Sequence, residues 1–561
     1  MNLEKQTKKN VFLCFTSILL VLTSTTTVLS EPTEPQTTPQ PTLETDWWTM
    51  LRHDANNTAS TTTPGPDTGQ LLWKTTIPEP IASTAPIIAN NHLYLNTNPP
   101  YYLNPPPNHS LLPPPPNPQK LLAALTTGYE GSIYCLDTAT GTHLWHKTFV
   151  SPNTPVYLND KLYFTDTNVY ALSSNLNCLN ANTGATIFNR PIAGGIAISP
   201  TITANGNLYF NAIDVYTFGG TVDCVDTNGH TKWTYNLPVY EWSFSPPTAD
   251  ATNVYIVTYN INSSYTGHLV CLNARTGASK WSKTIGNVFT YVNQPNIAVC
   301  SQGNVYVTDF NIQNYNTYLR CYNGNTGATQ WTHTLLQSLS FSPPAISNNS
   351  LYVTYGNLVT NQTFLLKLYA SNGTQQWITT QPNYAPLGNV YCTANKVLVT
   401  ATSDYTYSYG IYTYDKNTGE LLWYHIPTLE MAGTPAIANN TLYLTDYKGG
   451  IYAHTDQLTL TRFHLSLLTA GLTLTNTGNN TFTNITWRLT ATGGFLNTIN
   501  NTRNGTIATL PPHLRTNINT GLLIGFGPFT LNATIAPQGS PTFIKHAKGF
   551  ALGPLILITL H

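Results

Sequence analysis

Charged residues are scarce in this sequence. Only 9% of the 561 residues are Asp, Glu, Lys or Arg, and 24 basic side chains balance 24 acidic ones. Binding to nucleic acid or to an anionic membrane depends on a basic surface that neutralises phosphate groups. The composition therefore excludes an electrostatic case for either kind of partner.

Two cysteine motifs are also missing. No two cysteines are adjacent, and no C-x-x-C-H haem-attachment motif occurs. Five cysteines recur at one position of successive repeats, where equivalent atoms lie too far apart to form disulfides. We expect these five and two further ones to be small buried hydrophobic residues: Cys135, Cys178, Cys224, Cys271, Cys321, Cys300 and Cys392.

An apolar run near the N-terminus has the features of a targeting segment. Val11 to Leu22 follows three lysines and precedes small residues that end at Ser30, which is typical of a secretory signal peptide. The run is short for a bilayer, although a single-pass anchor is the alternative, and Cys14 within it has no lipobox. We expect a signal peptide over residues 1–30, a Pro/Thr-rich linker over 31–45, secretion or display at the cell surface, and no transmembrane span after cleavage.

What the chain does contain is a repeated turn and strand. DTATGTHLW, Asp137 to Trp145, recurs at intervals of about 43 to 50 residues, with Asp or Asn and Gly in the turn and an aromatic residue ending the motif. A proline, a strand such as HLYL and a second strand such as IYCLD precede each copy. A period of this size is typical of a propeller or a solenoid.

Each landmark occurs eight times, so the sequence predicts eight four-stranded units, an eight-bladed β-propeller over residues 46–456. The Trp73 strand precedes the first unit, and the last unit stops near Thr455 without a Trp strand. We therefore expect the N-terminal strand to complete the last blade and close the ring. A Pro-rich insertion at residues 96–128 is either a surface loop or a docking arm.

The motif D/N-x-x-T-G-x-x-x-W resembles the repeat of pyrroloquinoline-quinone (PQQ)-type propellers. In that family the tryptophan docks between neighbouring blades, which implies the same role here for seven side chains: Trp73, Trp145, Trp233, Trp281, Trp331, Trp377 and Trp423. Phe188 replaces the tryptophan in blade two, where we expect looser packing.

The period is lost after Asp456. Residues 457–561 alternate as strands and predict an immunoglobulin-like β-sandwich, with Phe550 to Leu560 as a final buried strand. The domain resembles those appended to archaeal surface proteins. Twelve N-x-S/T sequons are possible glycan sites in an exported chain: Asn56, Asn108, Asn262, Asn348, Asn361, Asn372, Asn439, Asn479, Asn484, Asn500, Asn504 and Asn532.

The resemblance makes a quinone-dependent dehydrogenase the enzyme hypothesis. Relatives of that kind hold PQQ and calcium over the axis and cover the quinone with a disulfide between adjacent cysteines, which this chain lacks. Its acids Asp166, Asp309 and Asp446 follow strands in contexts that indicate turn capping, and His143 and His146 are expected on opposite strand faces. We therefore expect no metal, PQQ or catalytic residues.

The alternative is a binding or scaffold propeller, similar to the lipoprotein propeller that assists outer-membrane barrel assembly. The B-to-C and D-to-A connections share one face and are rich in aromatics, which suit a cell-envelope protein or glycan. The expected binding residues are Tyr216, Tyr240, Trp242, Tyr259, Tyr265, Tyr291, Tyr315 and Tyr407.

Overall fold

The computed structural model describes residues 46–81, 85–97, 130–168, 171–192, 195–197, 201–202, 206–214, 216–262, 266–287, 297–339, 342–381, 388–402, 409–425, 434–446, 448–466, 469–478, 481–538, 542–553 and 555–559. The expected signal peptide (1–30), the expected linker (31–45) and nearly all of the 96–128 insertion lie outside these ranges. Among the described residues, no helix has the length and hydrophobicity needed to cross a bilayer.

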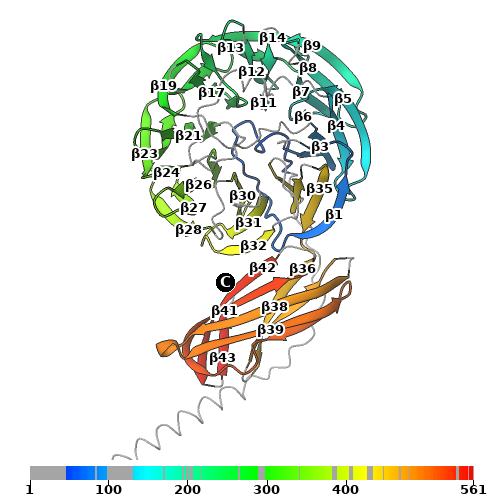
Figure 1. The fold of residues 1–561 in the computed structure, drawn as a ribbon, viewed down its shortest axis with the longest axis vertical. Helices are drawn as coiled ribbons and strands as arrows, with labels where there is room; N and C mark the ends of the chain where they lie inside the picture. The colour runs from blue at the N-terminus through cyan, green and yellow to red at the C-terminus, as the bar shows by residue number, and fades with distance from the viewer. Residues whose placement is uncertain are drawn as a thin grey trace, which may run out of the picture. The chain divides into compact units, whose positions relative to one another are not determined.

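The repeats fold into antiparallel sheets arranged radially about an axis (Figure 1). In unit one the strand after Pro86 pairs with the HLYL strand, that strand with IYCLD, and IYCLD with the Trp145 strand. The strands of units one to four are β2 (Ile87–Ala89), β3 (His92–Asn96), β4 (Glu130–Asp137) and β5 (His143–Val150); β6 (Val156–Leu158), β7 (Lys161–Asn168), β8 (Ser173–Asn180) and β9 (Thr186–Ile192); β10 (Ile196–Ala197), β11 (Thr201–Ile202), β12 (Leu208–Asp214), β13 (Gly219–Val225) and β14 (Thr231–Leu237); β15 (Glu241–Trp242), β16 (Thr248–Ala249), β17 (Asn253–Asn260), β18 (Thr266–Asn273) and β19 (Ser279–Asn287).

The later units follow the same order. Their strands are β20 (Val299–Ser301), β21 (Asn304–Asn311), β22 (Asn316–Asn323) and β23 (Thr329–Leu335); β24 (Ser338–Leu339), β25 (Ala345–Ser347), β26 (Ser350–Asn357), β27 (Gln362–Tyr369) and β28 (Gln375–Thr380); β29 (Val390–Cys392), β30 (Lys396–Thr402), β31 (Tyr409–Asp415) and β32 (Leu421–His425); β33 (Ala436–Ala438), β34 (Thr441–Thr445) and β35 (Gly450–Thr455).

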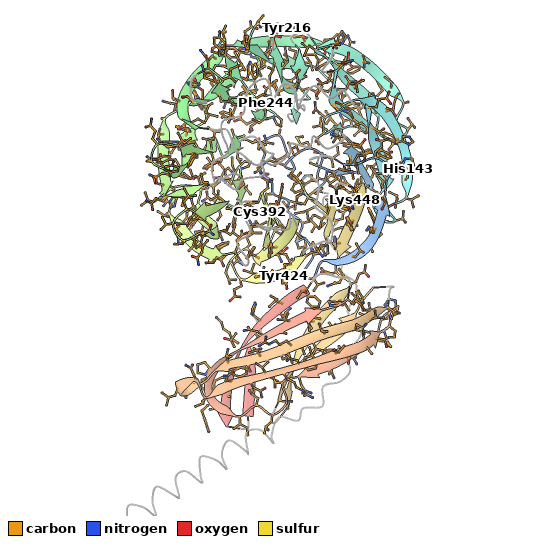
Figure 2. All side chains as sticks on the ribbon, viewed as in Figure 1. His143, Tyr216, Phe244, Cys392, Tyr424 and Lys448 are labelled. Atoms are coloured by element: carbon orange, nitrogen blue, oxygen red, sulfur yellow. The ribbon has the colours of Figure 1, made fainter. Side chains whose placement is uncertain are left out.

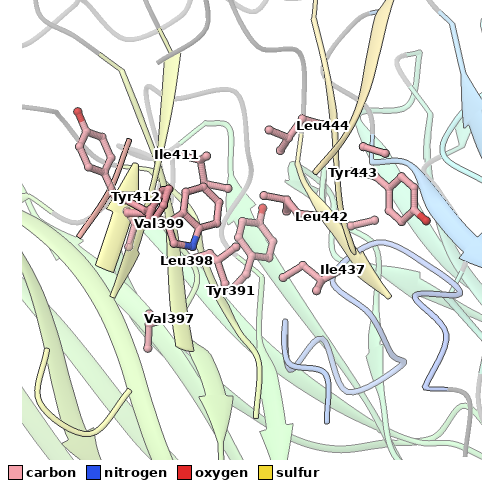
Figure 3. Close-up of a cluster of buried hydrophobic side chains, with 14 of the residues drawn as sticks. Tyr391, Val397, Leu398, Val399, Ile411, Tyr412, Ile437, Leu442, Tyr443 and Leu444 are labelled. Atoms are coloured by element: carbon pink, nitrogen blue, oxygen red, sulfur yellow. The ribbon is translucent and has the colours of Figure 1, made fainter. Parts of the chain in front are cut away.

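The ring is closed by the N-terminal strand. β1 (Gln70–Thr76) pairs antiparallel with β35, from Gln70 opposite Thr455 to Thr76 opposite Gly450, and completes the sheet β1-β35-β34-β33. The expected closure is confirmed. Apolar side chains such as Leu398, Ile411 and Leu442 fill the space between units seven and eight (Figure 3).

The repeated tryptophan lies against the turn of the following unit. The indole N–H of Trp331 donates to the carbonyl of Ala370 at 2.9 Å, and a methyl group on Gly373 would lie 2.5 Å from its ring. Gly373 has φ +70°, so a side chain is disfavoured there by the backbone and by the indole. The same pair of contacts recurs for the other six tryptophans. Phe188 lies over Gly229 instead, with the Arg190 guanidinium 5.5 Å from its ring.

Burial of these indoles differs more than the common motif suggests. Trp423 is fully buried and Trp233 is 9% exposed, whereas the other five are half-buried because the Trp strand is the outermost of its sheet. The Trp145 strand, β5, also contains a β-bulge. Leu144 is the extra residue between the pairs Cys135–Trp145 and Leu136–His143.

This bulge corrects the expectation for the two histidines. His143 and His146 lie on one face, with Nε2 and Nδ1 3.2 Å apart, because the extra residue interrupts the strict alternation of side chains. The His146 ring stacks on Tyr134 with centroids 5.1 Å apart. The described residues contain no group of three or more His, Cys, Asp or Glu that suits a metal.

The seven cysteines from Cys135 to Cys392 are buried and free, as expected. The turn-capping interpretation holds for Asp446, whose carboxylate accepts the N–H groups of Lys448 and Gly450 at 2.8 Å. It is wrong for Asp166, which accepts from Asn175 across the strand pair, and for Asp309, which pairs with Arg320 at 2.5 Å.

The C-terminal residues form two sheets. One is β36 (Leu458–Ser466), β37 (Thr469–Asn476) and β40 (Arg515–Asn519); the other contains β38 (Phe482–Gly493), β39 (Ile499–Leu510), β41 (Gly525–Ala536), β42 (Thr542–Gly553) and β43 (Leu555–Thr559), and the short helix η2 (Phe495–Asn497) links β38 to β39. β42 also pairs with β32 of unit seven, with Phe543 opposite Trp423. The expected single strand from Phe550 to Leu560 is wrong, because the chain turns at Gly553 and leaves Phe550 and Leu552 exposed.

We expect acid to weaken the ring closure, because His425 and the buried His454 lie beside the closing strand. Burial lowers the pKa of His425 to about 4 and, with repulsion from His425, lowers the pKa of His454 to about 3. Their rings lie 5.0 Å apart, and His454 Nδ1 is 2.9 Å from the carbonyl oxygen of Gly69. Since the unfolded chain protonates these histidines first, their contribution to stability is complete above about pH 6.5 and is lost as the pH falls towards 4.

We expect the urea concentration at the unfolding midpoint to decrease as the pH is lowered from 6.5 to 4. In His454→Gln this decrease should be smaller, because the amide still donates a hydrogen bond to the carbonyl of Gly69 but does not titrate. His513→Gln is the control, since His513 is exposed. An unchanged pH profile in His454→Gln would show that other groups cause the acid sensitivity.

Candidate functional site

The candidate site begins at the B-to-C turn of unit three, between β12 and β13. The Asp214 carboxylate accepts the N–H groups of Tyr216 at 2.9 Å and Thr217 at 3.2 Å, and hydrogen bonding by Thr217 and these N–H groups holds its pKa below the usual range. The turn leaves Tyr216 78% exposed at the outer edge of the ring (Figure 2). Phe218 ends the turn with φ +54° and is also exposed.

The D-to-A connector of the same unit lies against this turn. Tyr240 has φ +69°, its N–H donates to the carbonyl of Phe218 at 2.7 Å, and its carbonyl accepts from Ile261 at 2.9 Å. The Tyr240 backbone is thus held between the B-to-C turns of units three and four. Its ring remains 38% exposed beside the exposed Val239.

A row of aromatic rings runs inward from this surface. Phe218 lies 5.7 Å from Tyr240 and stacks on Trp242 at 6.5 Å, with an interplanar angle of 9°. Trp242 contacts Phe244 edge-on at 6.0 Å, and Phe244 stacks on Tyr259 at 5.3 Å. We call Tyr216, Phe218, Val239 and Tyr240 the aromatic surface. Of the inner rings, Trp242 and Tyr259 are buried and Phe244 is half-buried.

Glu241 anchors the connector from below. Its buried carboxylate lies 3.0 Å from His268 Nδ1 and accepts from the Thr258 hydroxyl at 2.6 Å and from Asn260 at 3.3 Å. Burial alone raises the pKa of Glu241, but the His268 and Thr258 hydrogen bonds outweigh it and lower the pKa overall. The His268 pKa is raised by the same contact. A carboxylate kept ionised by three donors suits a structural anchor better than an acid catalyst.

Positive φ at bulky residues is uncommon and costs energy. In unit six the residue before the C strand is Asn361, with φ +53°, a type that tolerates this conformation. Phe218 and Tyr315, with φ +54° and +55°, occupy the equivalent position in units three and five. In units three and five an aromatic side chain therefore stands where the backbone favours Asn or Gly.

The residues expected to bind a partner differ in their exposure. Tyr216, Tyr240 and Tyr315 are exposed, and Tyr265, Tyr291 and Tyr407 lie outside the described residues. Trp242 and Tyr259 are 6% and 5% exposed, so their place on the binding face is a correction: they are buried beneath Phe218 and Phe244. Phe218 was missed, although an aromatic residue directly before a C strand was its signal.

The axis is occupied by the chain's own residues 46–66, which we call the axial segment (Figure 1). Its carbonyls accept N–H groups from inner strands of six units: Trp48 from Ile88, Thr49 from Tyr157, Ala55 from Ala249, Asn56 from Cys300, Thr58 from Ile346 and Ala59 from Cys392. Sequence reasoning assigned residues 46–66 no such role. The innermost strand of each sheet is an edge, and these bonds satisfy it.

The histidine of the axial segment is paired within the segment, whereas its arginine also contacts a neighbouring unit. His53 lies 2.8 Å from Asp46 and 3.3 Å from Asp54, and despite burial these contacts raise its pKa to about 9. Arg52 is fully buried and donates to the carbonyl of Pro344 at 2.5 Å.

A protein-family model described as outer membrane protein assembly factor BamB matches residues 129–285 and 266–394. These are PQQ-type repeats. The europium-containing methanol dehydrogenase is a similar solved structure, with 12% identity, a TM-score of 0.50, and coverage of 73% of this chain and 98% of that chain. For the quinohemoprotein alcohol dehydrogenase from Comamonas testosteroni the identity is 13% and the TM-score 0.50, over 75% of this chain and 82% of that chain. At such identity the likeness shows the fold alone. No curated protein matches the sequence.

The described axis of this PQQ-type propeller does not fit PQQ with calcium. Calcium needs six to eight oxygen ligands, several of them carboxylates. The axial carboxylates of Asp46 and Asp54 are already engaged by His53, Thr58, Thr61 and Thr62.

Proposed function

We propose that the chain is a non-enzymatic binding or scaffold module that holds a cell-envelope protein or glycan on the aromatic surface. The observation that carries this proposal is the exposed cluster of Tyr216, Phe218 and Tyr240. Phe218 and Tyr240 have positive φ angles that are unfavourable for aromatic residues, and a hydrogen bond from the Tyr240 N–H to the Phe218 carbonyl joins them. Rigid rings of this kind bind with little loss of side-chain entropy.

The finer architecture belongs to the same proposal. It comprises a signal peptide (1–30), a linker (31–45), an eight-bladed propeller (46–456) and an immunoglobulin-like sandwich (457–561), exported to the cell surface. The radial sheets, the closing strand and the paired C-terminal sheets support this division.

We expect the double variant Tyr216→Ala/Tyr240→Ala to bind envelope extract or cell-wall polysaccharide about a hundredfold more weakly, since an exposed hot-spot ring contributes roughly 1.4 kcal/mol, or tenfold in Kd. The measurement is a pull-down titration with the full chain. Its matched control is Thr183→Ala/Thr326→Ala, on the exposed turns between C and D strands. Equal binding by both double variants, with unchanged melting, would contradict the proposal.

A PQQ-dependent dehydrogenase is the second candidate, favoured by the structural likeness to a methanol dehydrogenase and to a quinohemoprotein alcohol dehydrogenase. Dye reduction that requires added PQQ and calcium would establish it. The filled axis argues against that outcome.

A further inference from the structure

One strand of the C-terminal domain is the edge of its sheet among the described residues. β39 ends the sheet order β42-β41-β38-β39, extends over twelve residues and contains neither proline nor lysine. Its one charged side chain, Arg503, is occupied by the carbonyl and the amide oxygen of Asn519. Long exposed edges invite pairing with another chain unless something covers them.

β39 also carries two N-x-T sequons, Asn500 to Thr502 and Asn504 to Thr506. Residues two apart on a strand face the same way, so each asparagine shares a face with its threonine. All four side chains are exposed. The register places Asn500 opposite Thr492 and Asn504 opposite Arg488, on the solvent side of the sheet.

Other described sequons lack this combination. The hydroxyl residues of the sequons at Asn348, Asn361 and Asn439 are the buried Ser350, Thr363 and Thr441. The amides of Asn372, Asn484 and Asn532 are engaged by Thr374, Gln538 and His546. Asn56 belongs to the axial segment, where its side chain accepts a hydrogen bond from the Cys300 thiol at 3.3 Å.

We propose that Asn500 and Asn504 carry N-linked glycans that cover the β39 edge. This inference rests on the proposed export, because the co-reactant is a lipid-linked sugar diphosphate of the secretory membrane. The amide Nδ2 forms a bond to the sugar C1 and loses a proton to a base, while the C1–O bond breaks and the lipid diphosphate leaves. The two sites lie about 13 Å apart along the strand, so their glycans cover its length together.

The test uses the full chain with a C-terminal exposed sequon tag, secreted from a host that glycosylates that tag. We expect glycopeptide mass spectrometry to find Asn500 and Asn504 modified and Asn56 unmodified in the folded protein. Thr502→Ala removes the Asn500 glycan and Thr502→Ser retains it. The assignment would be overturned if Asn500 and Asn504 carried no glycan while the tag was modified. A glycan on Asn56 in folded protein would also overturn it.

The shielding role has its own readout. Asn500→Gln/Asn504→Gln should aggregate severalfold faster by light scattering, with an unchanged melting temperature and unchanged binding at the aromatic surface. Aggregation equal to the parent protein would overturn the shielding. Because these variants leave Tyr216 and Tyr240 intact, loss of the binding function and loss of the glycans are distinguishable.

Discussion

A chain that starts at Ile77 should not fold to a cooperative native state. It lacks β1, so β35 loses the partner that pairs from Gly450 to Thr455 and Gly141 loses the indole of Trp73. It also lacks the buried Gln70 side chain, which accepts the N–H groups of Gln457 and Leu458 at 3.0 and 2.9 Å.

The same truncation removes the axial segment and leaves inner-strand N–H groups of six units without their acceptors. Each buried unsatisfied donor costs about 1–3 kcal/mol, so the summed loss is comparable to the roughly 5–15 kcal/mol by which a typical protein is stable. Circular dichroism during heating measures the outcome.

Two further starting points separate the contributions. A chain from Asp46 keeps β1 and the axial segment and should have the melting temperature of the full chain. A chain from Asp67 keeps β1 but loses the axial segment, so its melting temperature should lie between those of the chains from Asp46 and Ile77. If the chain from Ile77 has the same melting temperature as the chain from Asp46, neither β1 nor the axial segment closes the ring.

Trp423→Ala should be the most damaging of the tryptophan substitutions. Trp423 is fully buried, its indole donates to the carbonyl of Pro66 at 3.1 Å, and its ring covers Gly69. Its backbone also pairs with Phe543 of β42. Replacing a buried tryptophan by alanine costs about 3–5 kcal/mol, and here the loss falls where unit seven, the axial segment and the C-terminal sheet meet.

Trp331→Ala is the matched control. Trp331 makes the same kind of hydrogen bond, to Ala370 at 2.9 Å, and covers Gly373, but its ring is half-buried. We expect about half the loss in free energy of unfolding, measured by urea titration. Equal losses in the two variants would show that docking against the next turn, rather than burial, sets the contribution of these residues.

The aromatic surface was partly visible in the sequence. Tyr216 and Tyr240 stand in connections that any four-stranded unit places on one face, so their exposure followed from strand order. Trp242 belongs to the same connection, but after Tyr240 the chain turns inward and buries Glu241 against Thr258 and His268. The indole of Trp242 is buried by the same turn. That turn depends on contacts with β17 and β18, which the sequence of the connection does not encode.

The sequence by itself determined the repeat, the strand order within each unit, the closing strand and the buried cysteines. All of these follow from patterns that recur with a fixed period, because every unit must pair its strands and bury one face of its sheet in the same way. Only the tertiary structure decided the path of residues 46–66, the shared face of His143 and His146, and the pairing of β42 with β32. The axial segment has no periodicity, and its partners lie from 40 to more than 300 residues away in the chain, from Ile88 to Cys392. Its conformation is set by the inner strand edges that surround it, and those edges come together only when the ring is formed.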